Sequence, residues 1–158
     1  MSSQEEYIRE EEGELVFDLR SLDLTEVTLE QVKLACSPNS MLRPTLSGSL
    51  STVTFLLLDH NDILELPTEI GDIHCLRKLS LIGNQLSSLP GSIGKLEQLT
   101  ILNVNENEII DLPASMKNLT KLETFSAVAN DLDHFLENGV CGELQSLKQL
   151  YLDENLLI

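Results

Sequence analysis

Asparagine recurs in this chain at a fixed interval. Successive copies are 23 residues apart, except for a last step of 25; they are Asn61, Asn84, Asn107, Asn130 and Asn155. Pro67, Pro90 and Pro113 keep the same 23-residue step, and apolar residues repeat in register with both sets. Several columns that share one such period are the signature of a solenoid, in which each repeat stacks on the next.

One period reads L-x-x-L-x-L-x-x-N-x-L-x-x-L-P-x-x-I-x-x-L, in which x is a variable residue. In one copy, Leu76, Leu79 and Leu81 occupy the first three leucine positions. The alternation of Leu79 and Leu81 with variable residues is typical of a strand with one buried face. Since only 4% of the residues are aromatic, we expect an aliphatic core that forms when repeats stack.

The polar and proline positions indicate how each repeat leaves its strand. Asn84 follows the strand, where the backbone turns away from its sheet partners. An amide side chain both donates and accepts hydrogen bonds, so we expect this asparagine column to form a structural ladder between repeats. Pro90 fixes φ at the start of a return segment. In that segment Ile93 and Leu96 form one apolar helical face.

This unit resembles the leucine-rich repeat, in the variant that has proline after the fourth leucine. The resemblance covers roughly residues 19–158. It implies an α/β solenoid with a curved parallel sheet on the concave side and short helical or extended returns on the convex side. The LPxxIGxL returns and the lack of cysteine caps resemble the intracellular repeats of Ras-pathway scaffolds, the Ras suppressor protein and the Scribble/Erbin group. In those proteins the repeats bind other proteins and catalyse nothing.

The sequence divides into two parts. Residues 1–14 are rich in glutamate and predict an acidic arm without regular structure. Residues 15–158 predict one domain of about six repeats, with a Ser-, Pro- and Gly-rich loop inserted at 36–51 and an incomplete last repeat. The bare end of that repeat leaves open a fragment, a short isoform, an incomplete gene model, or a second chain that covers it.

Two repeats depart from the consensus. In the first, we align Leu19, Leu22 and Leu24 with the strand leucines and Val27 with asparagine, which leaves an insertion of eleven residues before the second repeat. In the fifth, Leu136 replaces the proline, so we expect an irregular return there.

The charge limits the partners that such a chain can bind. The net charge is −16, from 26 acidic and 10 basic residues. Nucleic acids and anionic membranes are bound through Lys and Arg, so this balance argues against both. It favours a protein partner with a basic patch. The oligomeric state stays open.

The location of the protein is expected to be cytoplasmic, with the nucleus or the periphery of the plasma membrane as alternatives. The three cysteines, Cys36, Cys75 and Cys141, are far apart and favour reduced thiols. The first residues do not form a signal peptide, and no apolar run reaches the length of about 20 residues that spans a membrane. We therefore expect the sequon at Asn118 to stay unglycosylated.

The sequence contains no motif typical of a catalytic, metal-binding or phosphate-binding site. The chain lacks a nucleophile–base pair, paired cysteine or histidine ligands at metal-binding spacing, and a glycine-rich phosphate loop. The three histidines lie in different segments. We predict a protein that is not an enzyme and that uses no cofactor and no metal.

The candidate binding site is the concave face, formed by the variable residues between the strand leucines. Apolar residues there, beside an acidic border, are typical of a protein-binding surface. The alternative is that scattered exposed apolar residues carry no function. The candidate partner-binding residues are Phe55, Leu57, Asp59, His60, Lys78, Ile82, Ile101, Asn103, Asn105, Glu106, Val128, Tyr151 and Asp153.

The sequence thus predicts a non-catalytic protein-interaction module, a scaffold or adaptor in intracellular signalling. One alternative is the substrate receptor of a ubiquitin ligase, although residues 1–51 hold no recognisable ligase-docking motif. Another is the regulatory subunit of an enzyme such as a phosphatase.

Overall fold

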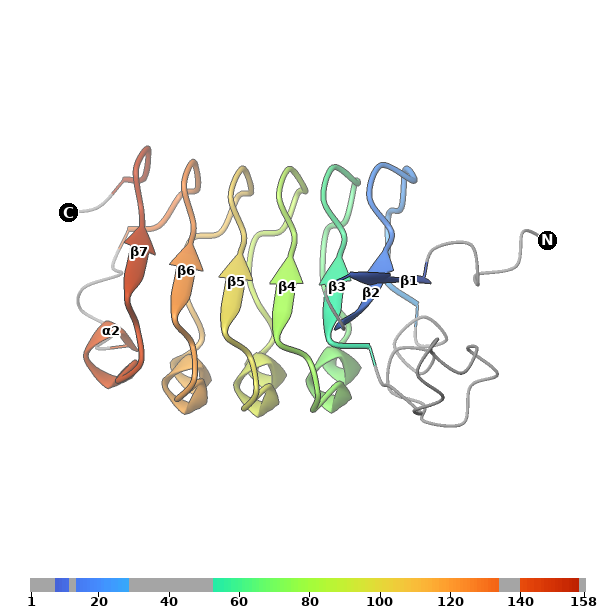
Figure 1. Ribbon diagram of the computed structural model, residues 1–158. Helices are drawn as coiled ribbons and strands as arrows, with labels where there is room; N and C mark the ends of the chain where they lie inside the picture. Colours follow the sequence, from blue (N-terminus) through green and yellow to red (C-terminus); the bar gives the residue numbers. More distant parts are fainter. Residues whose placement is uncertain (1–7, 12–13, 29–52, 134–139, 157–158) are drawn as a thin grey trace.

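The computed structural model describes residues 8–11, 14–28, 53–133 and 140–156. Its main element is a seven-stranded sheet whose strands follow one another in chain order (Figure 1). The strands are β1 (Ile8–Glu11), β2 (Glu14–Asp18), β3 (Phe55–Leu57), β4 (Lys78–Ser80), β5 (Ile101–Asn103), β6 (Thr124–Ser126) and β7 (Gln149–Tyr151). Strands β2 to β7 are parallel, and β1 is antiparallel to β2.

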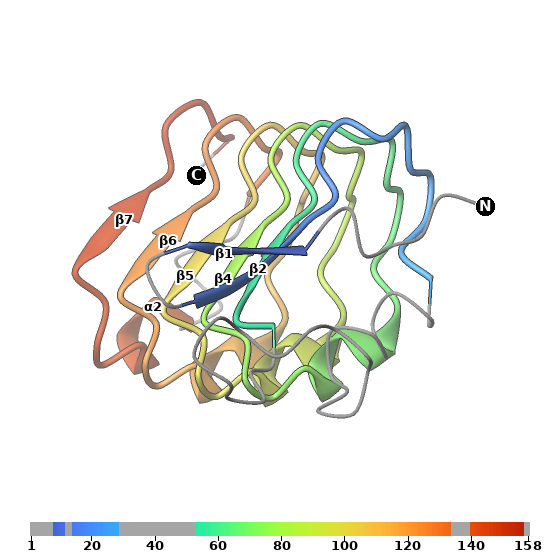
Figure 2. The ribbon, with the colours of Figure 1, turned by 45° about the vertical axis from the view of Figure 1, so that its right-hand side comes forward.

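Short helical turns connect the strands and line up along one side of the molecule (Figures 1 and 2). They are the 3-10 helices η2 (Thr68–Asp72), η3 (Gly91–Lys95) and η4 (Ala114–Asn118) and the α-helix α2 (Val140–Glu143). From β3 to β6, neighbouring strands pair residues that are 23 positions apart, such as Leu79 with Leu102. The α/β solenoid predicted from the repeat period is confirmed.

The core is an aliphatic column that runs through all the stacked repeats. In the repeats of β3 to β6 the middle residue of the strand is buried, and so is the second residue after it; Leu79 and Leu81 are fully buried. Leu86, Ile93 and Leu96 close the same repeat from the return side and are also fully buried. No repeat buries these side chains alone, so the stability of each depends on its neighbours.

The side-chain amides of the repeated asparagines form hydrogen bonds with the backbone of adjacent coils. The Oδ1 atom of Asn107 accepts from the backbone N of Leu86 at 3.1 Å. Its Nδ2 atom donates to the backbone O of Leu81 at 2.9 Å and of Val104 at 3.0 Å. Each of the other four asparagines also accepts from the preceding coil and donates to it. The ladder thus supplies partners to backbone groups that leave the sheet.

Proline and glycine shape the return segments. Pro90 precedes η3 with φ −66°, the value that its ring imposes. A Cβ atom on Gly94 would lie 2.3 Å from the backbone O of Ser115, and one on Gly71 would lie 2.4 Å from that of Ser92. Glycine at these positions therefore allows successive 3-10 helices to pack closely.

The first repeat lies in a different register from the one predicted. Phe17 pairs with Leu56, so that Leu19 occupies the column of Leu58, the third consensus leucine rather than the first. Phe17 and Leu19 are buried and fill the strand positions. The pairing offset is 39 residues instead of 23, so the insertion is sixteen residues rather than eleven. Both alignments present alternating apolar residues, and this repeat has no asparagine to choose between them.

The N-terminal arm also differs from the prediction. Within residues 1–14, which we expected to lack regular structure, Ile8–Glu11 forms β1 and covers the free edge of β2. An edge strand leaves backbone groups without partners, and the hairpin supplies them. Arg9 in β1 forms an ion pair with Asp18 in β2, which also pairs with Arg20 at 2.6 Å.

These contacts change the ionisation of Asp18. The hydrogen bond from the Arg20 guanidinium, together with the one from Arg9, holds the pKa of the Asp18 carboxyl well below its usual range, although partial burial acts in the opposite direction. The side chain is only 14% exposed. The hairpin is therefore held by backbone pairing and by a compact group of three charges.

The fifth repeat returns through α2, which packs against η4. This element is an α-helix where the other described returns are 3-10 helices. Leu136 and the inserted loop at 36–51 lie outside the described residues, so those two predictions stay predictions.

Candidate partner-binding surface

The outward side chains of the parallel strands, together with those two residues after the strands β3 to β7, form one surface, which we call the sheet face. Each of β3 to β7 has three residues, of which the first and third point outward and the second inward. Adjacent strands lie about 4.8 Å apart, so equivalent residues form rows across the repeats. Figure 2 shows these strands along one side of the molecule, with the helical turns below.

Six of the candidate residues lie on the strands of the sheet face; they are Phe55, Leu57, Lys78, Ile101, Asn103 and Tyr151. The structure brings them together as the prediction requires, but they differ in access. Phe55, Lys78, Ile101 and Asn103 are half-buried, Tyr151 is 45% exposed, and Leu57 is only 7% exposed. Leu57 is therefore closed to a partner in this conformation.

Phe55 and Lys78 interact with each other. The Nζ atom of Lys78 lies 5.9 Å from the centroid of the Phe55 ring. At this distance the cation is attracted to the ring face, with a strength of about 0.5–1 kcal/mol where solvent is present. Part of the aromatic surface that the sequence offered to a partner is thus already used within the chain.

The next column, two residues before the ladder asparagines, serves partly as a second set of backbone bridges. The Oδ1 atom of Asp59 accepts from the backbone N of Ile82 at 3.0 Å, and Asp59 is 7% exposed. The Oδ1 atom of Asn105 accepts from the backbone N of Val128 at 2.8 Å and from the Ser126 hydroxyl at 2.7 Å. A polar residue with an acceptor, two before the ladder asparagine, is the sequence signal that identifies this bridge.

The following column adopts the left-handed backbone conformation in every repeat. Its members are Ser21, His60, Gly83, Glu106, Ala129 and Glu154, with φ between 54° and 64°. Only one is glycine, although this region of φ favours glycine. His60 packs over Gly83, where an added Cβ would lie 2.6 Å from the His60 Nδ1 atom. The turn exposes the side chains of His60, Glu106 and Glu154 at its outer edge.

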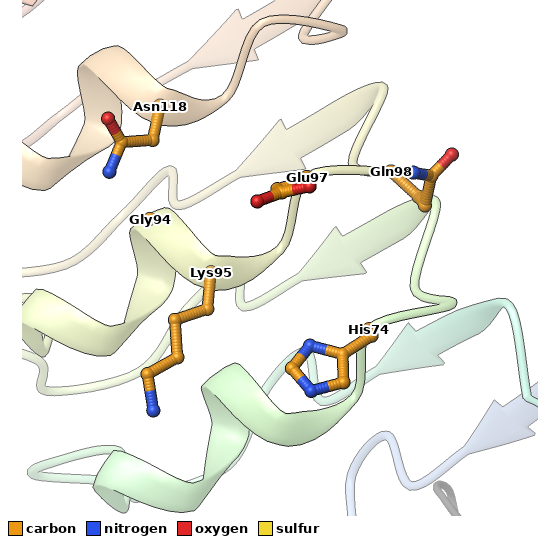
Figure 3. Close-up of a pocket in the computed structure, with 6 residues that line it drawn as sticks. All are labelled: His74, Gly94, Lys95, Glu97, Gln98 and Asn118. Carbon is orange, nitrogen blue, oxygen red and sulfur yellow. The ribbon is translucent and has the colours of Figure 1, made fainter.

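A shallow pocket of about 340 Å³ lies among the returns, away from the sheet face. Its lining is His74, Gly94, Lys95, Glu97, Gln98 and Asn118. Figure 3 shows that these side chains come from successive coils and that Glu97 and Gln98 point in different directions. Two of the polar groups already have partners: Lys95 lies 3.6 Å from Asp72, and Gln98 accepts from Lys121 at 2.5 Å.

The described part of the chain contains no candidate metal site and no candidate membrane-spanning helix. Its His, Cys, Asp and Glu residues form no group of three that could hold a metal ion. In the same ranges, no helix has the length and apolar character needed to cross a membrane. Cys75 is half-buried and donates its thiol to the backbone O of Val53 at 3.2 Å, which is a structural contact.

The repeats match a known protein family. The leucine-rich repeat region family matches residues 16–155. No curated protein sequence gives a match.

Many solved structures are similar to this chain, and three of them show the range of the similarity. The BIR3–SERK2 complex from Arabidopsis thaliana is 25% identical, with a TM-score of 0.59, over 80% of this chain and 64% of that chain. The leucine-rich repeat ectodomain of the Arabidopsis thaliana receptor kinase SOBIR1 is 24% identical, with a TM-score of 0.59, over 95% and 80% respectively. A leucine-rich repeat protein of Leptospira interrogans is 30% identical over 65% of this chain, with a TM-score of 0.48.

The chain is shorter than the proteins that it resembles, since it spans 32% of the Leptospira protein and 64% of the matched chain in the BIR3–SERK2 complex. The family match begins within β2 and extends past β7, so it includes part of β2 and all of the other parallel strands. The chain belongs to the leucine-rich repeat family.

Proposed function

We propose that this chain is a non-catalytic protein-interaction module that binds a partner on its sheet face and serves as a scaffold or adaptor in intracellular signalling, in the cytoplasm. The observation that carries this proposal is the set of outward apolar side chains, which the core does not need. Ile82, Ile101 and Val128 are half-buried on a surface whose inward residues already fill the solenoid. Apolar anchors with a polar border are the usual centre of a protein interface.

The regular register supports this proposal further. The parallel strands and the asparagine ladder hold the outward residues in fixed rows, so binding costs little conformational entropy. The BIR3–SERK2 complex is a protein–protein complex with the same fold.

The proposal is tested with two matched double variants of the full chain. Ile82→Gln with Ile101→Gln removes apolar surface from the sheet face without adding charge. Leu64→Gln with Ile110→Gln makes the same change at positions that are 58% and 53% exposed and lie off the strands. Tagged wild type and both variants are used to capture proteins from lysate, which are quantified by mass spectrometry.

We expect the same proteins with wild type and with the Leu64/Ile110 variant, and their loss from the Ile82/Ile101 variant. Circular dichroism must show that all three chains are folded. If the Ile82/Ile101 variant retains every protein that wild type captures, the sheet face is not the binding site.

A further inference from the structure

Among the described residues, the basic side chains on and beside the N-terminal half of the sheet face are already engaged within the chain. Arg77 forms an ion pair with Glu14, and Lys78 lies over the Phe55 ring. Arg9 and Arg20 pair with Asp18, whose position in β2 is in register with the outward Leu57. Cations therefore do bind to carboxylates and aromatic surface on this face, and there the chain supplies both members of each pair.

The C-terminal half has the opposite character. Five exposed carboxylates follow strands β5, β6 and β7, and we call them the acidic rim: Glu106, Glu108, Asp131, Asp153 and Glu154. Segments 101–111, 124–133 and 149–156 contain no Lys or Arg. Among the described residues, none of the five rim carboxylates forms an ion pair.

The backbone places the rim beside apolar surface. Glu106 and Glu154 stand on left-handed turns, which expose their side chains at the carboxyl ends of the strands. Val128 precedes the equivalent turn in β6's repeat and is half-buried, and Tyr151 is 45% exposed on β7. The rim thus borders an apolar part of the same sheet face.

We propose, on the basis of the function proposed above, that the partner binds through a basic, extended segment that lies across the carboxyl ends of β5 to β7. Its Lys or Arg side chains contact the acidic rim, and one apolar side chain contacts Val128 and Tyr151. Charge complementarity carries this assignment, since the net charge of −16 attracts cations over a long range, and in the described part of the chain the rim offers carboxylates without an ion pair beside the apolar Val128 and Tyr151.

The spacing of the rim suits an extended segment. Equivalent residues on neighbouring strands are about 4.8 Å apart, so Glu106 and Glu154, two strands apart, are separated by about 10 Å. An extended chain advances about 3.3 Å per residue and directs alternate side chains to one face, so cations two residues apart are about 6.6 Å apart. Two or three cations of one short segment can therefore reach the rim together. A second copy of this chain would carry the same negative charge and be repelled.

The test uses a fluorescein-labelled peptide in which arginine alternates with serine around one central leucine, and a matched peptide with glutamine in place of arginine. Binding of each peptide to the full chain is measured by fluorescence anisotropy at low and at high salt. The rim variant carries Glu106→Gln, Asp131→Asn and Glu154→Gln. The control variant carries Glu69→Gln, Glu97→Gln and Glu143→Gln on the returns, so both variants lose three negative charges.

We expect wild type and the control variant to bind the arginine peptide with similar affinity, and the rim variant to bind it about tenfold more weakly, as the loss of three exposed ion pairs implies. Salt should weaken binding to wild type, and the glutamine peptide should not bind. Equal losses in the rim and control variants would show attraction to the net charge alone and would overturn the assignment, as would unchanged binding to the rim variant.

The lysate experiment separates this inference from the proposed function. If the Ile82/Ile101 variant loses its captured proteins while the rim variant keeps them, the sheet face is the site but the basic segment is not its ligand. If the Ile82/Ile101 variant also keeps them, the proposed function itself fails.

Discussion

Replacing Asn107 by alanine should destabilise the chain more than the same change at Asn155, although both belong to one ladder. Asn107→Ala leaves the Leu86 backbone N–H without its acceptor in a buried place. An orphaned buried group costs about 1–3 kcal/mol. Asn107 also donates to three carbonyl groups, and each keeps another donor. Leu81 keeps the amide of Asn84, Val104 keeps that of Asn130, and Asn105 keeps the backbone N–H of Gly83. Their loss is therefore smaller, and the total expected cost is about 2–3 kcal/mol.

Asn155 differs because it is half-buried rather than buried. Water can replace the partners that Asn155→Ala removes from Leu132 and Ala127, so we expect a cost of about 1 kcal/mol. Gln85→Ala is the control, since its bond to Asp62 is exposed, and it should cost less than about 0.5 kcal/mol.

The three variants are compared by urea unfolding followed by circular dichroism, with the free energy of unfolding from linear extrapolation. The slope with urea should stay at the wild-type value. Equal costs for Asn107→Ala and Asn155→Ala, or a cost below about 0.5 kcal/mol for Asn107→Ala, would refute the reasoning that buried backbone satisfaction is the role of the ladder.

Three further predictions concern packing, backbone conformation and charge. Gly94→Ala should lower the free energy of unfolding by about 1–3 kcal/mol, because the new Cβ meets the backbone O of Ser115 at 2.3 Å. Gly91→Ala is the control and should not destabilise the chain, since nothing lies within 4 Å of its new Cβ. Equal effects of the two changes would contradict this. Ala129→Gly should raise the free energy of unfolding by about 1 kcal/mol, and with it the melting temperature, since Ala129 has φ +54°. A lower melting temperature would argue against strain there. The folded state lowers the pKa of Asp18, so the stabilising effect of this carboxylate is present above the unfolded pKa of about 3.8 and is lost progressively as pH falls from there towards the lower folded pKa. Asp18→Asn should therefore destabilise the chain at pH 7 more than at pH 3. A pH-independent effect in urea unfolding would contradict the ion-pair account.

The repeats could be predicted because their constraints recur. The asparagine, proline and leucine columns each reflect one local requirement, met again every 23 residues. The outward positions of the strands follow from the same register, so the sequence identifies which residues reach the sheet face.

The first repeat and the hairpin could not be predicted in this way. The segment from Leu15 to Leu24 alternates apolar residues in two compatible registers, and no asparagine selects one. The acidic composition of the arm indicates a solvated tail, and it does not reveal that Arg9 reaches Asp18 across an antiparallel pair. Both features depend on contacts between segments that no periodic column records.

The sequence also did not reveal which outward residues are available to a partner. Asp59 and Asn105 carry the same groups as a binding site would, yet they bridge to the backbone of the next repeat. Leu57 has an outward position but is closed to solvent. Residue type and position thus predict which side chains point outward, whereas their availability depends on their neighbours.

The most direct test of the sheet face as a binding surface is photo-crosslinking from single positions. A photoreactive amino acid replaces Ile101, which is half-buried on β5, or Ile110, which is 53% exposed off the strands. After irradiation in lysate, adducts are identified by mass spectrometry. The account predicts one discrete protein adduct from position 101 and none of it from position 110. The same adduct from position 110 alone, or no adduct from position 101, would contradict it.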